Sequence, residues 1–232
     1  TILVKGTNIK EKKILIVSFN HPPVMGGIET YSYNLMNFFT DFDEVETIFP
    51  TKKKSEKIAL RALNMIIFSI STLLKIFRKK YDVIHITNFN MWIIGYIYTF
   101  FNKNVKIIVN IWGLELVYKN KVGIIPKIHK IFVPLSFISK IKNFVFLTCS
   151  DSSNVLALEA GFIKNSIETI PLGVDRKQIL PVRKNIEFKK YFLFAGRIVE
   201  RKGLSWFVNN VLQNFPDYKV IVVGTIIDKE EF

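Results

Sequence analysis

The segment GRIVERKG, Gly196 to Gly203, carries two cations five residues apart, where an apolar run gives way to a helical pattern. Arg197 offers a planar guanidinium that can contact two oxygens of a phosphate, and Lys202 offers a compact positive charge. Free backbone N–H groups and the positive end of a helix dipole favour an anion at the same place. The segment therefore predicts a phosphate-binding turn, in which Gly196 lets the backbone turn tightly. A basic turn on the solvent-exposed surface is the alternative.

A second loop with paired glycines follows the first apolar run of the chain. In the sequence FNHPPVMGGIET, Gly26 and Gly27 stand directly before a helical pattern, and Glu29 lies in its first turn. Paired glycines let a ligand contact the backbone, but a turn that needs positive φ explains them equally well. The favourable interaction of a carboxylate with the positive end of the helix dipole explains Glu29 equally well. The spacing is not the G-x-G-x-x-G of dinucleotide-binding folds, which argues against a plain nicotinamide-cofactor enzyme.

The three histidines and the single cysteine do not form a recognisable catalytic group. His21 is the best placed, because it follows a strand and ligands bind at the carboxyl ends of parallel strands. His85 lies inside the apolar run DVIHIT, where a hydrogen-bonded core histidine is the commoner role, and His129 lies in a basic helical segment. Cys149 ends an apolar run as a structural thiol, and a lone cysteine fits a reducing cytoplasm. No Ser-His-Asp or metal-ligand pattern is present, so no catalytic residue and no metal site are assigned.

The segments that must position these residues alternate between short apolar runs and helical patterns. This alternation predicts βαβ units and an α/β fold whose parallel sheet is covered on both faces. The expected strands are Lys13–Ser18, Val45–Phe49, Val83–Thr87, Val105–Ile111, Phe144–Cys149, Ile167–Ile170, Tyr191–Ala195 and Lys219–Val223. The expected helices are Glu29–Phe39, Ile58–Arg78, Met91–Phe101, Ile124–Ile141, Ser153–Ala160 and Leu204–Gln213.

The chain is expected to contain two domains of unequal size. The polar stretch 176–190 contains Pro181 and lacks apolar periodicity, so it is the expected linker between residues 1–175 and 191–232. The second part offers only one βαβ unit, which leaves sheet edges and apolar surface unpaired and makes a poor independent domain. The sequence is therefore expected to be a fragment or an early-terminated product.

The composition is basic, with a formal net charge of +14. Lys, Asn and Ile are frequent throughout, so a biased coding composition explains part of the lysine excess. A basic chain favours anionic partners such as nucleotide phosphates, acidic lipid surfaces or nucleic acid. Nucleic acid ranks last, because the basic residues are spread among aliphatic helices and not interleaved with exposed aromatic residues.

Two basic segments, Lys52 to Lys80 and Lys119 to Lys142, combine lysines with apolar helical patterns. Polar residues interrupt the apolar run Ile58 to Phe77, which predicts an amphipathic helix and not a membrane span. Each segment either packs its apolar face on the sheet or binds electrostatically to an anionic leaflet. In the second case the first domain would present the Gly26–Gly27 loop to an acceptor at the membrane. The N-terminal residues do not resemble a signal peptide, so a cytoplasmic protein is expected.

Taken in order, the motifs resemble those of retaining glycosyltransferases with the GT-B fold, the family called glycosyl transferases group 1 or family 4. The resemblance covers Lys12 to about Gly224. Its motifs are GGIE at 26–29, DVIH at 82–85, NIWG at 110–113, TCSDSS at 148–153, IPLGVD at 170–175, GRIVERKG at 196–203 and the strand end IVVG at 221–224.

The resemblance implies a complete N-terminal Rossmann-like domain with a doubly wound parallel sheet, followed by a partial second Rossmann-like domain that binds the nucleotide sugar. Gly196, Arg197 and Lys202 would bind the donor diphosphate, and the Gly26–Gly27 loop with Glu29 would contact a phosphate or the acceptor. The implied cleft residues are His21, His85, Trp112, Gly113 and Gly224. The donor is a substrate, and no cofactor is expected.

The implied reaction is sugar transfer with retention, from a nucleotide diphosphate sugar to a glycan or lipid-linked acceptor, in cell-envelope polysaccharide or lipopolysaccharide synthesis. The expected place is the cytoplasm or the inner face of the plasma membrane. Three departures from the family pattern stand out: Trp112 replaces a histidine, Leu172 replaces an asparagine, and no two glutamates stand eight positions apart. A non-catalytic fragment that binds membrane or glycan is therefore the alternative.

Overall fold

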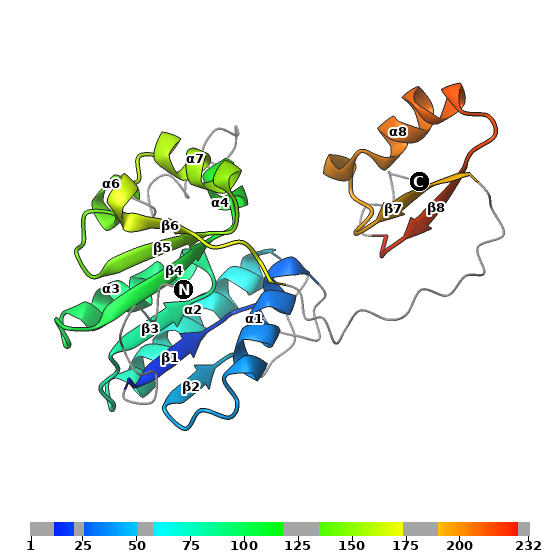
Figure 1. Cartoon of the computed structure of the whole chain (residues 1–232). Coiled ribbons are helices and arrows are strands. Elements are labelled where there is room, and N and C mark those ends of the chain that lie inside the picture. The colour runs from blue at the N-terminus through cyan, green and yellow to red at the C-terminus, as the bar shows by residue number, and fades with distance from the viewer. Residues whose placement is uncertain (1–11, 21–25, 51–57, 118–134, 174–189, 227–232) are drawn as a thin grey trace. The chain divides into compact units, whose positions relative to one another are not determined.

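The computed structural model describes residues 12–20, 26–50, 58–117, 135–173 and 190–226, and the chain divides into two compact units (Figure 1). The first unit is Thr1–Gly173 and the second is Val174–Phe232. His21, His129 and nearly all of the expected linker fall outside the described residues.

The first unit is built on a six-stranded parallel sheet with the strand order β2-β1-β3-β4-β5-β6. Its strands are β1 (Ile14–Val17), β2 (Val45–Ile48), β3 (Val83–Ile86), β4 (Lys106–Ile111), β5 (Phe144–Thr148) and β6 (Ile167–Thr169). The chain leaves β1 in one direction to form β2 and returns on the other side to form β3. The strand order therefore reverses between β1 and β3, and in open α/β sheets such a reversal is where ligands bind.

Helices connect these strands. They are α1 (Gly27–Phe38), α2 (Ile58–Ile76), α3 (Trp92–Thr99), α4 (Leu114–Val117), α6 (Leu135–Ile138) and α7 (Asp151–Glu159), with short 3-10 turns η2 (Phe89–Met91) and η4 (Lys164–Ser166). Helix α7 begins where the Ser150 side chain accepts a hydrogen bond from the backbone N–H of Ser153, an ordinary N-cap. Of the helix expected over Ile124–Ile141, the described part shows only α6.

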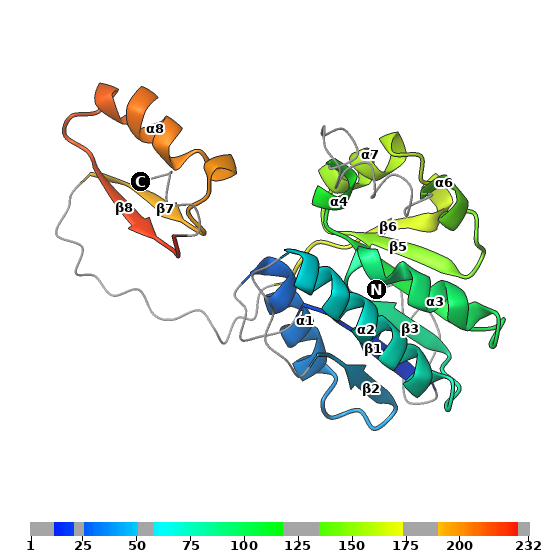
Figure 2. The same ribbon diagram turned by 180° about the vertical axis from the view of Figure 1, so that it is seen from behind.

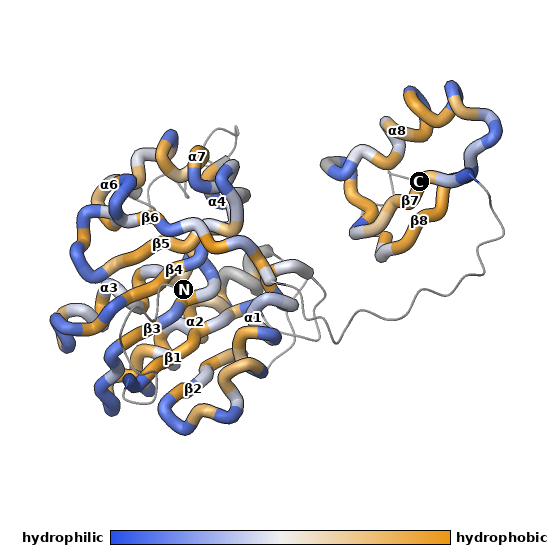
Figure 3. Tube along the Cα trace, viewed as in Figure 1, coloured by the Kyte–Doolittle hydropathy of each residue, from blue (hydrophilic) through white to orange (hydrophobic). Residues whose placement is uncertain are grey.

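The main core lies between the sheet and the layer that contains α2 and α3, which cover one face of the sheet (Figure 2). Alternate residues of each central strand point into it, for example Leu15 and Val17 of β1. On the other face α1 packs Met36 and Phe39 against Ile16. Because both faces are covered, β1 and β3 are buried at every position and are apolar throughout apart from His85 (Figure 3).

Helix α2 packs on the sheet as expected but differs from an ordinary amphipathic helix. Its inner side buries Phe68, Thr72 and Ile76. Its outer side is also apolar, since it carries Ile67 and Leu74, whose side chains are largely exposed. Among the described residues, no helix is long and apolar enough to cross a membrane.

The second unit is one βαβ arrangement. Its elements are the parallel pair β7 (Tyr191–Ala195) and β8 (Lys219–Val223), helix α8 (Leu204–Asn210), and the 3-10 turns η6 (Glu200–Lys202) and η7 (Leu212–Asn214). Phe192 packs against Phe207, Phe215 and Tyr218, with ring centroids 4.9–5.5 Å apart. Leu193 of β7 remains exposed, as expected for a sheet of two strands.

Amides of β7 and β8 are therefore expected to exchange with solvent at least about 100-fold faster, after correction for intrinsic rates, than those of β3 and β4, because few buried contacts hold them. Hydrogen exchange followed by mass spectrometry measures this in the intact chain. Equal protection of the two pairs of strands would contradict the expectation.

Candidate functional site

Three buried hydroxyl groups join the ends of β1 and β3 to helix α1 where the strand order reverses. Ser18 Oγ donates to Ser32 Oγ at 2.8 Å, Ser32 Oγ to Thr87 Oγ1 at 3.1 Å, and Thr87 Oγ1 back to Ser18 Oγ at 2.7 Å. All three residues are fully buried. The ring fixes the start of α1 against the carboxyl edge of the sheet.

The chain that leaves β1 is held by the side chain that follows β3. Asn88 Oδ1 accepts hydrogen bonds from the backbone N–H of Phe19 at 2.9 Å and of Asn20 at 3.3 Å. Asn20 is buried, and its own Oδ1 has no hydrogen-bond partner among the described residues. Sequence reasoning missed Asn20 and Asn88. The polar residues that directly follow two apolar runs were the signal that could have found them.

The Gly26–Gly27 loop forms the N-terminus of α1. Gly26 is the N-cap residue with an extended backbone, φ 172°, and no side chain caps the helix there. A Cβ on Gly26 would contact the Glu29 carboxylate, which folds back over the helix start, whereas nothing lies near a Cβ on Gly27. Neither glycine has a positive φ. The alternative that these glycines serve a positive-φ turn is therefore wrong.

His85 and Asn110 make a buried polar pair on adjacent strands. His85 Nε2 lies 2.6 Å from Asn110 Oδ1, so the tautomer protonated at Nε2 donates a hydrogen bond to the amide oxygen. Asn110 also hydrogen-bonds the Tyr31 hydroxyl of α1, although burial raises the pKa of that phenol overall. Burial lowers the pKa of His85, outweighing the hydrogen bond to Asn110. His85 is therefore a neutral, hydrogen-bonded residue beneath the edge, in agreement with the commoner role for a strand histidine.

Trp112 lies at the carboxyl end of β4, where the resemblance implies a histidine. Its indole Nε1 donates to the carbonyl oxygen of Thr87 at 2.8 Å, and its ring packs edge-on against Tyr31 at 5.0 Å. Gly113 follows with φ 92°, a left-handed conformation that favours glycine. Because the indole N–H is already bonded, the half-buried Trp112 side chain offers only ring carbons for contact with a ligand.

Glu115, in α4, brings a carboxylate close to this turn. Its Oε1 accepts from the backbone N–H of Trp112 at 3.4 Å, and its Oε2 has no partner among the described residues. Burial raises the pKa of Glu115, although backbone hydrogen bonds oppose the shift. Sequence reasoning did not single out this residue, because only the fold brings α4 under the turn.

The lowered pKa of His85 predicts a pH dependence of stability. The unfolded chain takes up this proton as the pH falls through about 6.5, while the folded chain resists it, so the free energy of unfolding should decrease below pH 6.5. Urea unfolding at pH 7.5, 6.5 and 5.5 measures the slope. The variant His85→Gln should lose its share of this slope, and identical slopes in both proteins would contradict the assignment.

In the second unit, the turn after β7 meets the end of β8. A Cβ on Gly224 would collide with the Gly196 carbonyl, so the two backbones approach as closely as glycine allows. Beyond them Ile198 forms a parallel bridge with Ile226, which extends the pairing.

Two cations of this turn lie on the surface. Arg197 and Lys202 are exposed, and no carboxylate of the described residues lies within ion-pair distance of either. Lys202 ends the 3-10 turn η6, and Gly203 then caps α8 in a left-handed conformation with φ 69°. The expected strand, glycine turn and helix are all present, although α8 ends three residues before the expected Gln213.

No protein-family model and no curated protein matches this chain, but solved structures do. HepE from Anabaena, in complex with UDP and glucose, gives a TM-score of 0.64 at 15% identity over 95% of this chain and 63% of HepE. The lipopolysaccharide outer core galactosyltransferase WaaB gives 0.57 at 13% identity, over 94% of this chain and 62% of WaaB. The N-terminal domain of Candida albicans trehalose-6-phosphate phosphatase gives 0.55 at 12% identity over 97% of this chain and 67% of that domain.

These similarities confirm the expected fold. The chain is an α/β protein of the GT-B type, with a six-stranded parallel sheet in the first unit and a smaller α/β unit after it. It spans less than two thirds of the length of HepE and WaaB.

Proposed function

We propose that this chain is part of an enzyme that transfers a sugar, with retention, from a nucleotide diphosphate sugar to a glycan or lipid-linked acceptor. The observation that carries the proposal is the turn Gly196–Gly203 in a GT-B fold. Its exposed cations Arg197 and Lys202 form no ion pair with a described residue and lie beside a close glycine contact. The neighbours support it, since HepE was crystallised with UDP-glucose and WaaB is a galactosyltransferase.

On the donor side, Arg197 and Lys202 would bind the diphosphate. The Gly196–Gly224 contact leaves the carboxyl ends of β7 and β8 without side chains, so a phosphate can approach the backbone there. As the glycosidic bond breaks, negative charge builds on the leaving nucleotide, and fixed cations stabilise it without reorganisation. Arg197 and Lys202 would thereby supply the electrostatic stabilisation that a divalent metal supplies in other transferases.

On the acceptor side, the carboxyl edge of the first unit suits hydroxyl groups better than phosphate. The Glu29 carboxylate lies against Gly26 and would repel an anion, but it can accept a hydrogen bond from a sugar hydroxyl. Buried Asn20 Oδ1, which has no hydrogen-bond partner among the described residues, is another acceptor at this edge. Trp112 offers an apolar ring, because its N–H already binds Thr87. We therefore assign the Gly26–Gly27 loop to the acceptor.

The proposed place of action is the cytoplasm or the inner face of the plasma membrane, in cell-envelope polysaccharide or lipopolysaccharide synthesis. The test is a panel of UDP-, GDP- and ADP-sugars, with turnover assayed in the presence of candidate acceptors and the product anomer read by NMR. Transfer with retention from one donor supports the proposal. Glycan binding without binding of any nucleotide sugar would favour a non-catalytic glycan-binding role.

A further inference from the structure

The outer side of α2 carries a regular apolar stripe. Its residues recur at alternating spacings of three and four, so they lie in one row along the helix. They are Leu60, Leu63, Ile67, Ile70, Leu74 and Phe77, each between 38% and 62% exposed. We call this row the outer stripe. It is separate from the inner residues of α2 that pack on the sheet.

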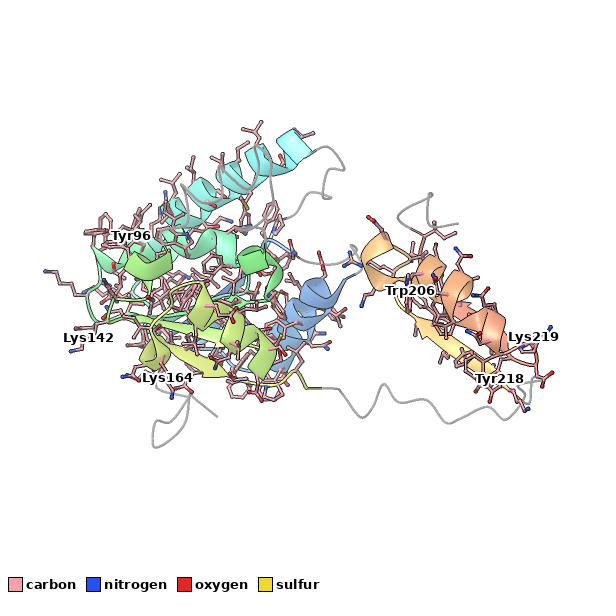
Figure 4. All side chains as sticks on the ribbon, turned by 90° about the horizontal axis from the view of Figure 1, so that it is seen from above. Tyr96, Lys142, Lys164, Trp206, Tyr218 and Lys219 are labelled. Atoms are coloured by element: carbon pink, nitrogen blue, oxygen red, sulfur yellow. The ribbon has the colours of Figure 1, made fainter. Side chains whose placement is uncertain are left out.

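The outer stripe continues onto the end of α3. The rings of Phe77 and Phe101 lie 4.2 Å apart, and Phe100 and Phe101 are 67% and 68% exposed. Figure 4 shows α2 at the border of the first unit, with its outer side chains pointing away from the sheet. A continuous exposed apolar surface of this length marks an interaction site more often than chance exposure does.

The charged residues of α2 and of the turn that follows it, up to Lys80, are all positive. Lys75, Arg78 and Lys80 are exposed and form no ion pair with a described residue, whereas Lys79 pairs with Glu46 at 2.8 Å. The sequence has no Asp or Glu between Ile58 and Lys80. An apolar row on a helix whose own charges are all positive fits a partner that is both apolar and anionic. The boundary between the headgroups and acyl chains of an anionic bilayer is such a partner.

A second copy of this chain fits the stripe less well. In a parallel pair of α2 helices Arg78 would face Arg78, and like charges across a helix seam destabilise it. An antiparallel pair would not neutralise Arg78 either, because the sequence from Ile58 to Lys80 contains no Asp or Glu. Charge therefore disfavours self-association.

We propose that α2 lies along an anionic lipid surface, with its outer stripe inserted at the headgroup boundary and Lys75, Arg78 and Lys80 against the phosphates. This inference deepens the proposed place of action at the inner face of the plasma membrane by naming the surface that makes the contact, and it does not depend on transferase activity. It also differs from docking by lysines alone, because the apolar row should hold part of the bound protein at high salt, when screening has weakened the charges.

The test is flotation of the 232-residue chain with vesicles of phosphatidylglycerol and of phosphatidylcholine at low and high salt. The chain should bind phosphatidylglycerol vesicles, and part of the binding should survive high salt. The variant Ile67→Gln, Ile70→Gln, Leu74→Gln should bind them at least about tenfold more weakly, because interfacial binding scales with the buried apolar area. The variant Lys75→Gln, Arg78→Gln, Lys80→Gln should lose the salt-sensitive part only.

A matched control replaces three apolar residues of similar exposure on and after α7. Val155→Gln, Leu158→Gln, Ile163→Gln, at 38–52% exposure, should bind vesicles as the unaltered chain does. Equal losses in the control and stripe variants, no loss in the stripe variant, or no binding by the unaltered chain would overturn the proposal. Analytical sedimentation gives a further contrary outcome. If the unaltered chain forms a dimer, the stripe variant does not, and vesicles are not bound, then a second copy and not a lipid surface covers the stripe.

A label gives a readout that does not rely on loss of binding. With Cys149→Ala to remove the native thiol, an environment-sensitive fluorophore on Ile70→Cys should shift to the blue when phosphatidylglycerol vesicles are added. The same fluorophore on Val155→Cys should not shift. Absence of a shift at position 70, with the chain bound to vesicles, would mean that another surface makes the contact.

Discussion

Replacing Arg197 or Lys202 with alanine is expected to weaken the binding of a nucleoside diphosphate by about 1.5–3 kcal/mol each, the usual worth of hydrogen bonds to charged groups. Both side chains are exposed and have no carboxylate partner among the described residues, so removing them should not disturb the folded unit. Isothermal titration calorimetry with UDP, GDP and ADP measures the change in affinity for whichever nucleotide binds.

The matched control for these two variants is Lys219→Ala. Lys219 is an exposed cation of the same unit at the amino end of β8, away from the glycine turn. It should leave the affinity unchanged, apart from a small effect of net charge that salt removes. If Arg197→Ala and Lys202→Ala bind as tightly as the Lys219→Ala variant, the two cations do not form a diphosphate site.

The second large effect is expected from Gly224→Ala. The added methyl group would meet the Gly196 carbonyl, so the ends of β7 and β8 would have to separate, at a cost of about 1–3 kcal/mol or more. Since the second unit has only these two strands in the described residues, we expect both loss of amide protection in β7 and β8 and loss of nucleotide binding. Hydrogen exchange and calorimetry on the same sample check the two effects.

Gly173→Ala is the control for this variant, because nothing lies within 4 Å of a Cβ at that position. It should preserve both the protection and the affinity. Retained protection of β7 and β8 in Gly224→Ala would show that the two glycines do not approach as closely as the structure indicates.

The strands could be predicted closely from the sequence, because parallel strands covered on both faces are continuous apolar runs. Ile14–Val17, which is buried at every position, illustrates this. Every expected strand is present to within one residue at each end. Short α4 was missed because four residues contain too little periodicity to be recognised.

The site could be predicted only in part. The motif residues at strand ends were found, because the carboxyl edge of a parallel sheet is where ligand-binding residues gather. The contact of Gly196 with Gly224 depends on the register of β7 and β8, in which Ala195 faces Val223, and a sequence does not display register. Hydropathy likewise could not show that the outer stripe of α2 stays exposed, since both sides of that helix are apolar.

The most direct test of the proposed donor site is an NMR titration of the isotope-labelled chain with UDP, GDP and ADP. Binding at the proposed site predicts that one of them shifts the amide signals of Gly196, Lys202, Gly203 and Gly224 most strongly, while the matching nucleoside without phosphates shifts none of them. Shifts that cluster elsewhere, or no shifts with any of the three nucleotides at millimolar concentration, would contradict the assignment of this turn to the donor diphosphate.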